Sequence, residues 1–240
     1  MKFSVLTYNL KFNKAAETIK ELLLKYLPDI VCFQEIAITD SSFELIENLG
    51  YRLADYSNSF IRRKEVFGVT TFYNSKAFSP IKSNSFNLPT NFYQIVSFFL
   101  HGNKNPRTVL KNELIHKKSK KHITLYNIHL SPFATNNLRT RQIKNTFEDM
   151  SLDKSEAVII AGDFNFPYGR KRFENLISEH KLKEATSNIN FTLEKRIVKN
   201  ITIKLKLDYV LYKKLKLLSN KKISNFNKSD HFPILSVFNV

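Results

Sequence analysis

Residues 157–167 read AVIIAGDFNFP, an apolar run that ends in a glycine and two polar side chains. A short run of small and β-branched apolar residues is typical of a strand buried on both faces of a sheet. Asp163 and Asn165 follow two positions apart, so in an extended segment they point to one side while Phe164 points to the other. A carboxylate beside an amide is suited to holding a water molecule next to a phosphoryl oxygen. A turn with local hydrogen bonds is an equally good interpretation of this stretch alone.

The same arrangement, an apolar run with a polar residue at its end, recurs along the chain. The residues in question are Asn9 after 2–8, Glu35 after 29–33, His129 at the end of 122–129, Asp208 within 203–212, and Asp230 and His231 before 232–238. Each one alone is more simply a turn former, a solvated charge or a hydrogen-bonded core residue. Strand ends are also where a rigid scaffold brings distant side chains together, and so many of them predict one shared site.

The other elements predict the fold class. Helices are expected over 14–26, 41–48, 135–150 and 170–180, and further strands over 51–56, 66–73, 94–100, 108–115 and around 201–211. Strands that follow one another directly, mixed with a few helices, favour an α+β fold of two packed sheets with helices outside. The polar segment 102–121 is expected to form a hairpin with a basic tip.

Length and composition limit the class of protein further. At 240 residues we expect a single domain over 1–240, able to bury a large core without disulfides. The only cysteine, Cys32, excludes an intramolecular disulfide and favours a reducing compartment. No apolar run approaches the roughly 20 residues that span a bilayer, and 1–8 do not form a signal peptide. We therefore expect a cytoplasmic monomer without stable membrane insertion.

The net charge indicates the class of partner. Lys and Arg number 38 against 21 Asp and Glu, which gives a formal net charge of +17. Such a field attracts polyanions, nucleic acid first among them, and also anionic membrane surfaces. The joint richness in Lys, Asn, Ile and Phe is also what an AT-rich genome produces without selection for binding. The charge therefore suggests a partner but not a reaction.

Six motifs carry a resemblance to a known family. They are, in order, TYNL (7–10), FQE (33–35), NIHLSP (127–132), AGDFNFP (161–167), LDYVL (207–211) and SDHFPI (229–234). Together they resemble the endonuclease/exonuclease/phosphatase superfamily, which includes deoxyribonuclease I, exonuclease III, neutral sphingomyelinases and inositol polyphosphate 5-phosphatases. The resemblance extends over residues 3–237. It implies a four-layer α/β sandwich and Mg²⁺-dependent cleavage of phosphate esters, with Mn²⁺ as a possible substitute.

The resemblance also implies roles for individual residues at the metal. Glu35 resembles the principal metal ligand, with Asn9 and Asp230 near the same ion. Magnesium prefers carboxylate oxygens and keeps several of its waters, so one or two direct protein ligands suffice.

At the phosphate, the resemblance implies a second set of roles. Asp163 resembles the residue that orients or deprotonates the attacking water, and Asn165 a donor to the phosphoryl oxygens. His231, held by Asp208, resembles the imidazole at the scissile phosphate, as a base or as a charged clamp.

His129 distinguishes branches of the superfamily. Deoxyribonuclease I and the sphingomyelinases place a histidine here that protonates the leaving oxygen, whereas exonuclease III-like enzymes use a tyrosine. In deoxyribonuclease I this histidine pairs with a glutamate that precedes an aromatic strand. Glu65 stands at a similar place in this sequence. A solvated charge in a basic loop is the alternative interpretation of Glu65.

The resemblance to the superfamily does not identify the substrate of this chain. Tryptophan is absent, unlike in abasic-site enzymes, and the chain is basic and lacks the disulfides of secreted deoxyribonucleases. The leading hypothesis is a Mg²⁺-dependent DNA endonuclease; the alternatives are a sphingomyelinase-like or other lipid or inositol phosphatase, and an inert nucleic-acid-binding module. Expected phosphate contacts, or else plainly solvated side chains, are Arg62, Arg63, Arg139, Arg170 and Arg172.

Overall fold

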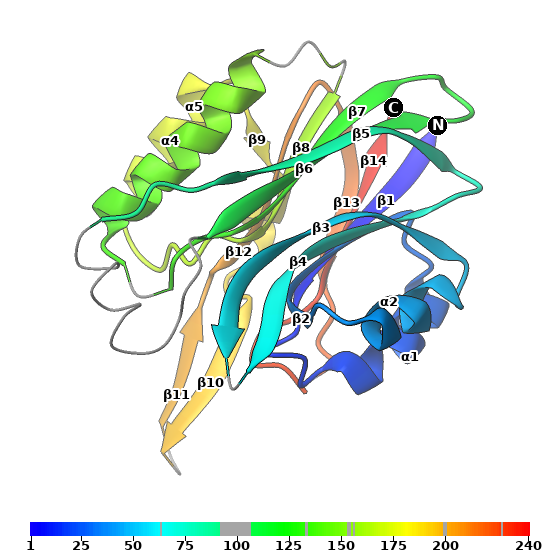
Figure 1. The fold of residues 1–240 in the computed structure, drawn as a ribbon. Coiled ribbons are helices and arrows are strands. Elements are labelled where there is room, and N and C mark those ends of the chain that lie inside the picture. Colours follow the sequence, from blue (N-terminus) through cyan, green and yellow to red (C-terminus); the bar gives the residue numbers. More distant parts are fainter. Residues whose placement is uncertain are drawn as a thin grey trace.

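Two six-stranded sheets pack face to face, with helices on both outer faces (Figure 1). The computed structural model describes residues 1–62, 64–91, 107–132, 134–152, 155, 157–198, 201–226 and 228–240. The strand orders are β13-β14-β1-β2-β4-β3 in the first sheet and β5-β6-β7-β8-β12-β9 in the second. This is the expected α+β class, a four-layer sandwich of two mixed sheets flanked by helices.

The first sheet carries the two N-terminal helices. Its strands are β1 (Lys2–Asn9), β2 (Ile30–Ala37), β3 (Tyr51–Arg62), β4 (Glu65–Asn74), β13 (Lys216–Lys222) and β14 (Ile234–Asn239). β1 and β2 are parallel, and the connection between them holds η1 (Ala16–Thr18) and α1 (Ile19–Tyr26). α2 (Asp40–Glu47) follows β2 and begins at Thr39, whose hydroxyl accepts a hydrogen bond from the Ser42 N–H.

The second sheet carries the two later helices. Its strands are β5 (Phe78–Asn87), β6 (Thr108–His116), β7 (His122–His129), β8 (Ala157–Asp163), β9 (Lys183–Glu184) and β12 (Asp208–Lys213). β7 and β8 are parallel and are joined by α4 (Asn136–Leu152). α5 (Arg170–Glu179) follows β8, and η2 (Ala185–Asn188) follows β9.

Three apolar clusters hold the layers together. The central cluster joins the inner faces of the two sheets and includes Val5, Cys32, Leu125 and Ile159. The other two bury the helices against the outer faces, α1 and α2 on the first sheet and α4 and α5 on the second. Because β8 is covered on both faces, all of its residues are buried, as its continuous apolar sequence predicts.

Several of the predicted elements differ from the structure. The stretch 201–211, expected as one strand, is β11 (Ile201–Leu205) and the start of β12. β5, β10 (Leu193–Val198) and β13 were not predicted, because they are edge or hairpin strands with mostly polar or exposed residues. The expected hairpin tip within 102–121 is confirmed between β6 and β7. The expected strand 94–100 lies outside the described residues.

A separate two-stranded sheet, β10 with β11, projects from the body of the molecule (Figure 1). Its base is tied to the main fold, since Leu193 forms an isolated bridge with His231. Among the helices described, none is long and apolar enough to cross a membrane.

Candidate active site

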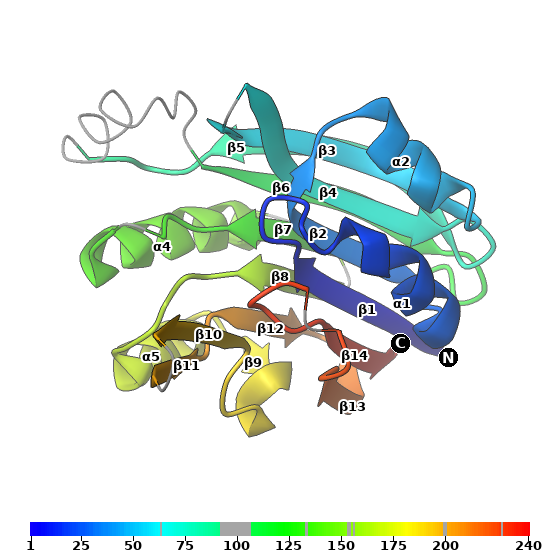
Figure 2. The ribbon, with the colours of Figure 1, turned by 90° about the horizontal axis from the view of Figure 1, so that it is seen from below.

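The polar residues singled out in the sequence lie at one end of the sandwich. Asn9 at the end of β1 pairs with Gln34 of β2, and His129 at the end of β7 pairs with Asp163 of β8. Asp208 at the start of β12 pairs with Asp163 from the other side. Figure 2 looks onto this end, where β1, β2, β7 and β8 lie side by side. Both sheets therefore contribute to one site.

Glu35 reaches the site through an irregularity in β2. The register with β4 shifts between Gln34 and Ile36, so Glu35 is an extra residue in the strand. Its φ of 55° lies in the left-handed region, which a non-glycine residue adopts at a cost. A bulge of this kind re-aims a side chain. The Glu35 carboxylate is fixed there by the Phe12 N–H, which donates to Oε2 at 3.0 Å.

Glycine is required next to Asp163 because β7 and β8 approach closely. Gly162 has a φ of 141°, and a Cβ at this position would lie 2.0 Å from the Ile128 carbonyl oxygen. No larger residue fits there without displacing one of the strands. The glycine of the AGDFNFP stretch thus allows the two strand ends to place His129 and Asp163 together.

Asp163 is the centre of the site's hydrogen bonds. Its Oδ2 accepts from Asn9 Nδ2 at 2.9 Å, and its Oδ1 accepts from the Asn165 N–H at 2.9 Å. Burial raises the pKa of the Asp163 carboxyl, and the nearby His231 offsets only part of that effect. Asn165 also donates from Nδ2 to the Leu130 carbonyl at 3.1 Å, which leaves the second hydrogen of its amide for another acceptor.

His231 and Asp208 form a buried pair. His231 Nδ1 lies 2.8 Å from Asp208 Oδ2, and its Nε2 lies 3.9 Å from Asp163 Oδ2. Burial disfavours the charged imidazole, but Asp208 and Asp163 outweigh burial and raise the pKa of His231. Asp208 is itself positioned by Thr192, whose hydroxyl accepts from the Asp208 N–H at 2.9 Å. The geometry therefore favours a charged His231.

His129 has a different neighbour and the opposite shift. Arg107 Nη1 lies 3.0 Å from His129 Nδ1. Because a guanidinium has no acceptor, the arginine donates and the proton of the neutral imidazole is on Nε2. Burial, followed by the Arg107 charge, holds the pKa of His129 well below its usual value. The Arg107 guanidinium also lies over the Phe60 ring, 4.6 Å from its centroid.

The Nε2 atom of His129 faces the centre of the site without a hydrogen bond. It is 3.6 Å from Glu35 Oε1 and 3.6 Å from Asp163 Oδ2, both beyond hydrogen-bonding distance. A buried donor is rarely left unpaired. Its position suits an acceptor atom of a substrate that would complete the site.

The oxygen ligands of the site fit a divalent cation, whereas a charged His231 has no lone pair to offer one. Asp163, Asp208 and His231 are buried, and one ligand atom from each lies within 4.8 Å of the others. Glu35 is also buried, and burial raises its pKa although Arg107 partly offsets this. The positive charge around these buried carboxylates does not fully offset their burial, and a hard cation with oxygen ligands would supply more.

Two predicted site residues lie at the margin. Asp230, expected near the metal, forms an ion pair with Lys11 at 2.8 Å. Glu65, expected beside His129, is an exposed residue at the tip of the β3–β4 hairpin, opposite Arg62. Among the described residues, Arg107 and not Glu65 is the charged group that contacts His129 Nδ1. Sequence reasoning missed Arg107 because it lies in a polar segment with no motif around it.

The arginines expected at phosphates differ in their surroundings. Arg62 is exposed and lies over the Phe12 ring, 3.8 Å from its centroid. Arg170 forms ion pairs with Glu174 and Glu184, and Arg172 donates to Asn137 Oδ1 at 2.6 Å.

Arg139 does not have the surface position expected of a phosphate contact. It is only 5% exposed, and it donates to the Ser131 and Pro132 carbonyls. It thereby fixes the loop that follows His129, which explains its burial. Arg63 lies outside the described residues.

Comparison with known proteins identifies the family. Residues 6–231 match the Endonuclease/Exonuclease/phosphatase family. The chain belongs to this family. No curated protein sequence matches the chain.

Solved structures of diverse family members share the fold. The human Nocturnin catalytic domain with bound sulfate has a TM-score of 0.78 at 20% identity, over 99% of this chain and 94% of that one. D. rerio TDP2 with a single-strand DNA product has a TM-score of 0.71 at 13% identity, over 100% and 99%. A Bacteroides thetaiotaomicron mannosyl-6-phosphatase has a TM-score of 0.74 at 14% identity, over 99% and 100%. At such identities the likeness concerns the fold alone.

Proposed function

We propose that this family member is a metal-dependent phosphodiesterase that cleaves DNA at internal positions. The observation that carries the proposal is the buried meeting of Glu35, Asp163, Asp208 and His231, with the unpaired Nε2 of His129 facing them. Membership of a family composed mostly of phosphoester hydrolases supports the general reaction. DNA as the substrate is supported by the +17 charge.

In this proposal Glu35 would be the principal ligand of Mg²⁺, and Asn9 beside it orients Asp163 through its 2.9 Å hydrogen bond. When bound, the ion neutralises charge on the phosphate and on the leaving oxygen. In this proposal Asp230, paired with Lys11 at 2.8 Å, acts beside the ion and not as a direct ligand.

The chain's own groups then act on water and phosphate. Asp163 orients the attacking water and accepts its proton, while the free amide hydrogen of Asn165 binds a phosphoryl oxygen. His231, kept charged by Asp208, is a donor to the phosphate and not the base.

His129 is assigned to the leaving oxygen. Because Arg107 donates a hydrogen bond to His129 Nδ1, the imidazole proton is on Nε2 and faces the reacting group. A neutral imidazole with its proton on Nε2 can donate a hydrogen bond to the departing oxyanion and stabilise its charge, while water supplies the proton that the oxyanion takes up.

The test is cleavage of supercoiled plasmid and linear DNA with Mg²⁺, Mn²⁺ or EDTA. We expect nicked plasmid with either ion and none with EDTA. Asp163→Asn should lower the rate by about 10² to 10⁴, the usual contribution of a general base. The matched control is Asp40→Asn, an equal loss of charge at an exposed position on α2. Absence of cleavage with any divalent ion, or equal rates for the two variants, would overturn the proposal and favour an inert binding module.

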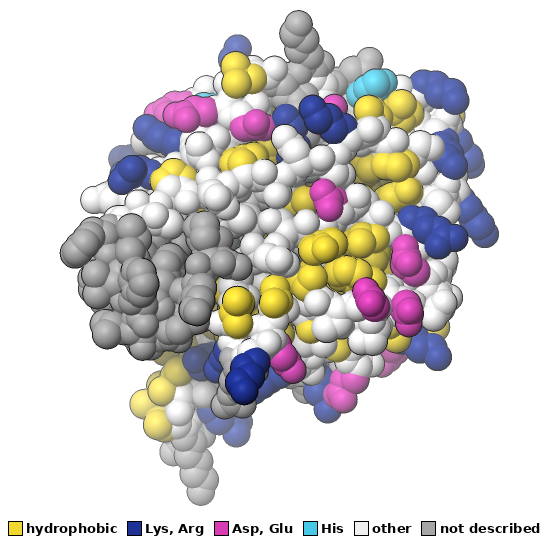
Figure 3. All heavy atoms as spheres, in the orientation of Figure 1, with side chains coloured by type: hydrophobic (Ala, Val, Ile, Leu, Met, Phe, Trp, Pro, Cys, Tyr) yellow, Lys and Arg dark blue, Asp and Glu magenta, His cyan; other side chains and the backbone are white. Residues whose placement is uncertain are grey.

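A second candidate is a phosphodiesterase acting on lipid at a membrane surface. The β10–β11 hairpin exposes four apolar side chains, and Figure 3 shows hydrophobic atoms on this projection at the lower left. They are Ile197 (50% exposed), Val198 (54%), Ile201 (56%) and Ile203 (41%). Lys195, Arg196 and Lys204 lie on the same hairpin. Apolar residues beside cations suit an anionic lipid surface.

Mixed sphingomyelin and phosphatidylserine vesicles discriminate between the two candidates. If lipid is the substrate, headgroup release exceeds DNA cleavage, and Ile197→Ser with Ile201→Ser lowers vesicle hydrolysis without changing cleavage of a short soluble ester. If DNA is the substrate, vesicle hydrolysis stays at background and the same variants leave plasmid nicking unchanged.

A further inference from the structure

A second concentration of positive charge lies at the far end of the sandwich. A hollow of about 360 Å³ is bordered by six lysines together with Leu215, Asn239 and Val240. The lysines are Lys121, Lys181, Lys183, Lys213, Lys214 and Lys216. We refer to these six as the distal lysine cluster.

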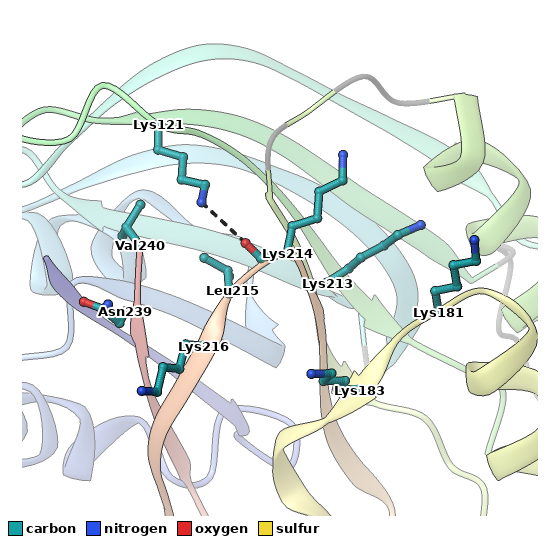
Figure 4. Close-up of a pocket in the computed structure, with 9 residues that line it drawn as sticks. All are labelled: Lys121, Lys181, Lys183, Lys213, Lys214, Leu215, Lys216, Asn239 and Val240. Carbon is teal, nitrogen blue, oxygen red and sulfur yellow. Dashed lines mark hydrogen bonds between the residues drawn. The ribbon is translucent and has the colours of Figure 1, made fainter.

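Four separate parts of the fold supply the cluster. Lys121 precedes β7, Lys181 follows α5, Lys183 is in β9, and the remaining three surround the turn from β12 to β13. Lys121 Nζ donates to the Lys214 carbonyl at 3.4 Å, which closes one side of the hollow (Figure 4). The cluster is therefore a tertiary feature and not a run of lysines in the sequence.

The cluster is far from the active site. In the β8–β12 ladder, Asp208 faces Asp163 at the catalytic end and Lys213 faces Val158 at the other end. Five residues of strand, at about 3.3 Å each, separate the two ends by about 17 Å. A group bound at the cluster cannot also occupy the catalytic site.

The ammonium groups of the cluster form no ion pair within the described part of the chain. None of the six ammonium groups has a carboxylate within 4.0 Å among the described residues, in contrast to Lys11, Lys111 and Lys206 elsewhere. Lys214 donates only to the Ser155 carbonyl, at 3.3 Å. Like charges held around one hollow repel one another, so an anion bound there is stabilised.

The chemistry of the lining defines the ligand. Lysine binds phosphate as a point charge, without the paired geometry that arginine imposes. No aromatic side chain borders the hollow among the described residues, so bases have nothing to stack on. Figure 4 shows the ammonium groups spread around the hollow and not directed at one point. This spacing suits a row of phosphates more than a single one.

We propose that the distal lysine cluster binds the phosphate backbone of a nucleic acid, independently of base sequence, as a second contact for long substrates. The functional consequence rests on the proposed nuclease activity, but the binding itself does not. A strand held at both places dissociates more slowly than one held at the catalytic pocket alone. A dinucleotide, at about 3.4 Å per residue, is too short to reach both places at once and cannot use the cluster as a second contact.

The experiment compares two triple variants of equal charge. Lys181→Gln, Lys183→Gln and Lys213→Gln together alter the cluster, while Lys20→Gln, Lys25→Gln and Lys82→Gln alter exposed lysines elsewhere. Both sets are placed in the Asp163→Asn background so that DNA is not consumed, and thermal unfolding confirms that both fold. Binding of a 60-base-pair duplex is followed by fluorescence anisotropy over a series of NaCl concentrations.

We expect the cluster variant to lower the slope of log affinity against log salt by about 2.7, from three contacts at roughly 0.9 each. The control variant should change the slope by less than one contact. Equal slopes for the two triple variants would overturn the proposal, because net charge alone would then explain the binding.

Inorganic tripolyphosphate distinguishes a compact free polyphosphate from a nucleic acid. If it binds the starting protein but not the cluster variant while the duplex slopes are equal, the hollow is a small-polyphosphate site and the nucleic-acid proposal is wrong. Failure of the nuclease assay does not affect these slopes, so the two proposals fail separately.

Discussion

The contact between Arg107 and His129 gives the sharpest test of the catalytic assignment. Arg107→Met removes the donor 3.0 Å from His129 Nδ1 and keeps an unbranched side chain near Phe60. Without that donor, the proton of His129 is free to move to Nδ1, and the donor that faces the leaving oxygen is lost. Loss of a positioned hydrogen-bond donor lowers kcat by about 10² or more, whereas the lost charge-assisted hydrogen bond costs roughly 1.5–3 kcal/mol of stability.

Two measurements separate a role in positioning from a general loss of structure. A p-nitrophenyl phosphodiester has a leaving group that departs without a proton, so Arg107→Met should slow it far less than DNA. Long-range ¹⁵N–¹H NMR should show His129 protonated on Nε2 in the original chain and on Nδ1 in the variant. Equal slowing of both substrates, or an unchanged tautomer, would refute the reasoning. Arg107→Lys, which keeps one donor, should retain part of the activity on DNA.

Three further outcomes follow from the site and its surroundings. Gly162→Ala should destabilise the fold by about 1–3 kcal/mol or more in chemical denaturation, because its Cβ would lie 2.0 Å from the Ile128 carbonyl oxygen. Mg²⁺ binding near neutral pH should release protons, because burial raises the pKa of Glu35 and Asp163 and the cation displaces the protons that these carboxyl groups carry. Calorimetric heats that depend on the buffer would show this release. Burial lowers the pKa of His116, so the unfolded chain binds its proton more readily and stability falls as the pH drops through about 6.5. His116→Gln should therefore reduce the change in unfolding free energy between pH 7.5 and 5.5, and an unaltered pH dependence would contradict this.

The sequence could predict the central strands and the site because both depend on buried apolar runs. β8 reads AVIIAGD and is buried throughout, and the polar residues after such runs meet at one end of the sandwich. The edge strands could not be predicted in this way. β5, with the sequence FSPIKSNSFN, is held by its pairing with β6 and has little apolar periodicity of its own.

Contacts made by tertiary structure also escaped prediction. Arg107 and His129 are 22 residues apart and meet only because β6 and β7 pair. Arg139 was expected at the surface, yet its carbonyl acceptors in the loop after His129 lie inside the fold. The sequence alone does not distinguish a buried arginine from an exposed one, because the fold determines its burial and its hydrogen-bond partners.

The two imidazoles of the site illustrate how neighbours divide the catalytic roles. Both are buried, and burial alone would lower the pKa of each. Asp208 adds negative charge beside His231 and keeps it protonated, whereas Arg107 adds positive charge beside His129 and keeps it neutral. Groups whose surroundings push their pKa values apart carry different tasks in one reaction. A charged clamp at the phosphate and a neutral donor at the leaving oxygen are therefore built from the same residue type, and exchanging Asp208 and Arg107 for uncharged residues should make the two histidines alike.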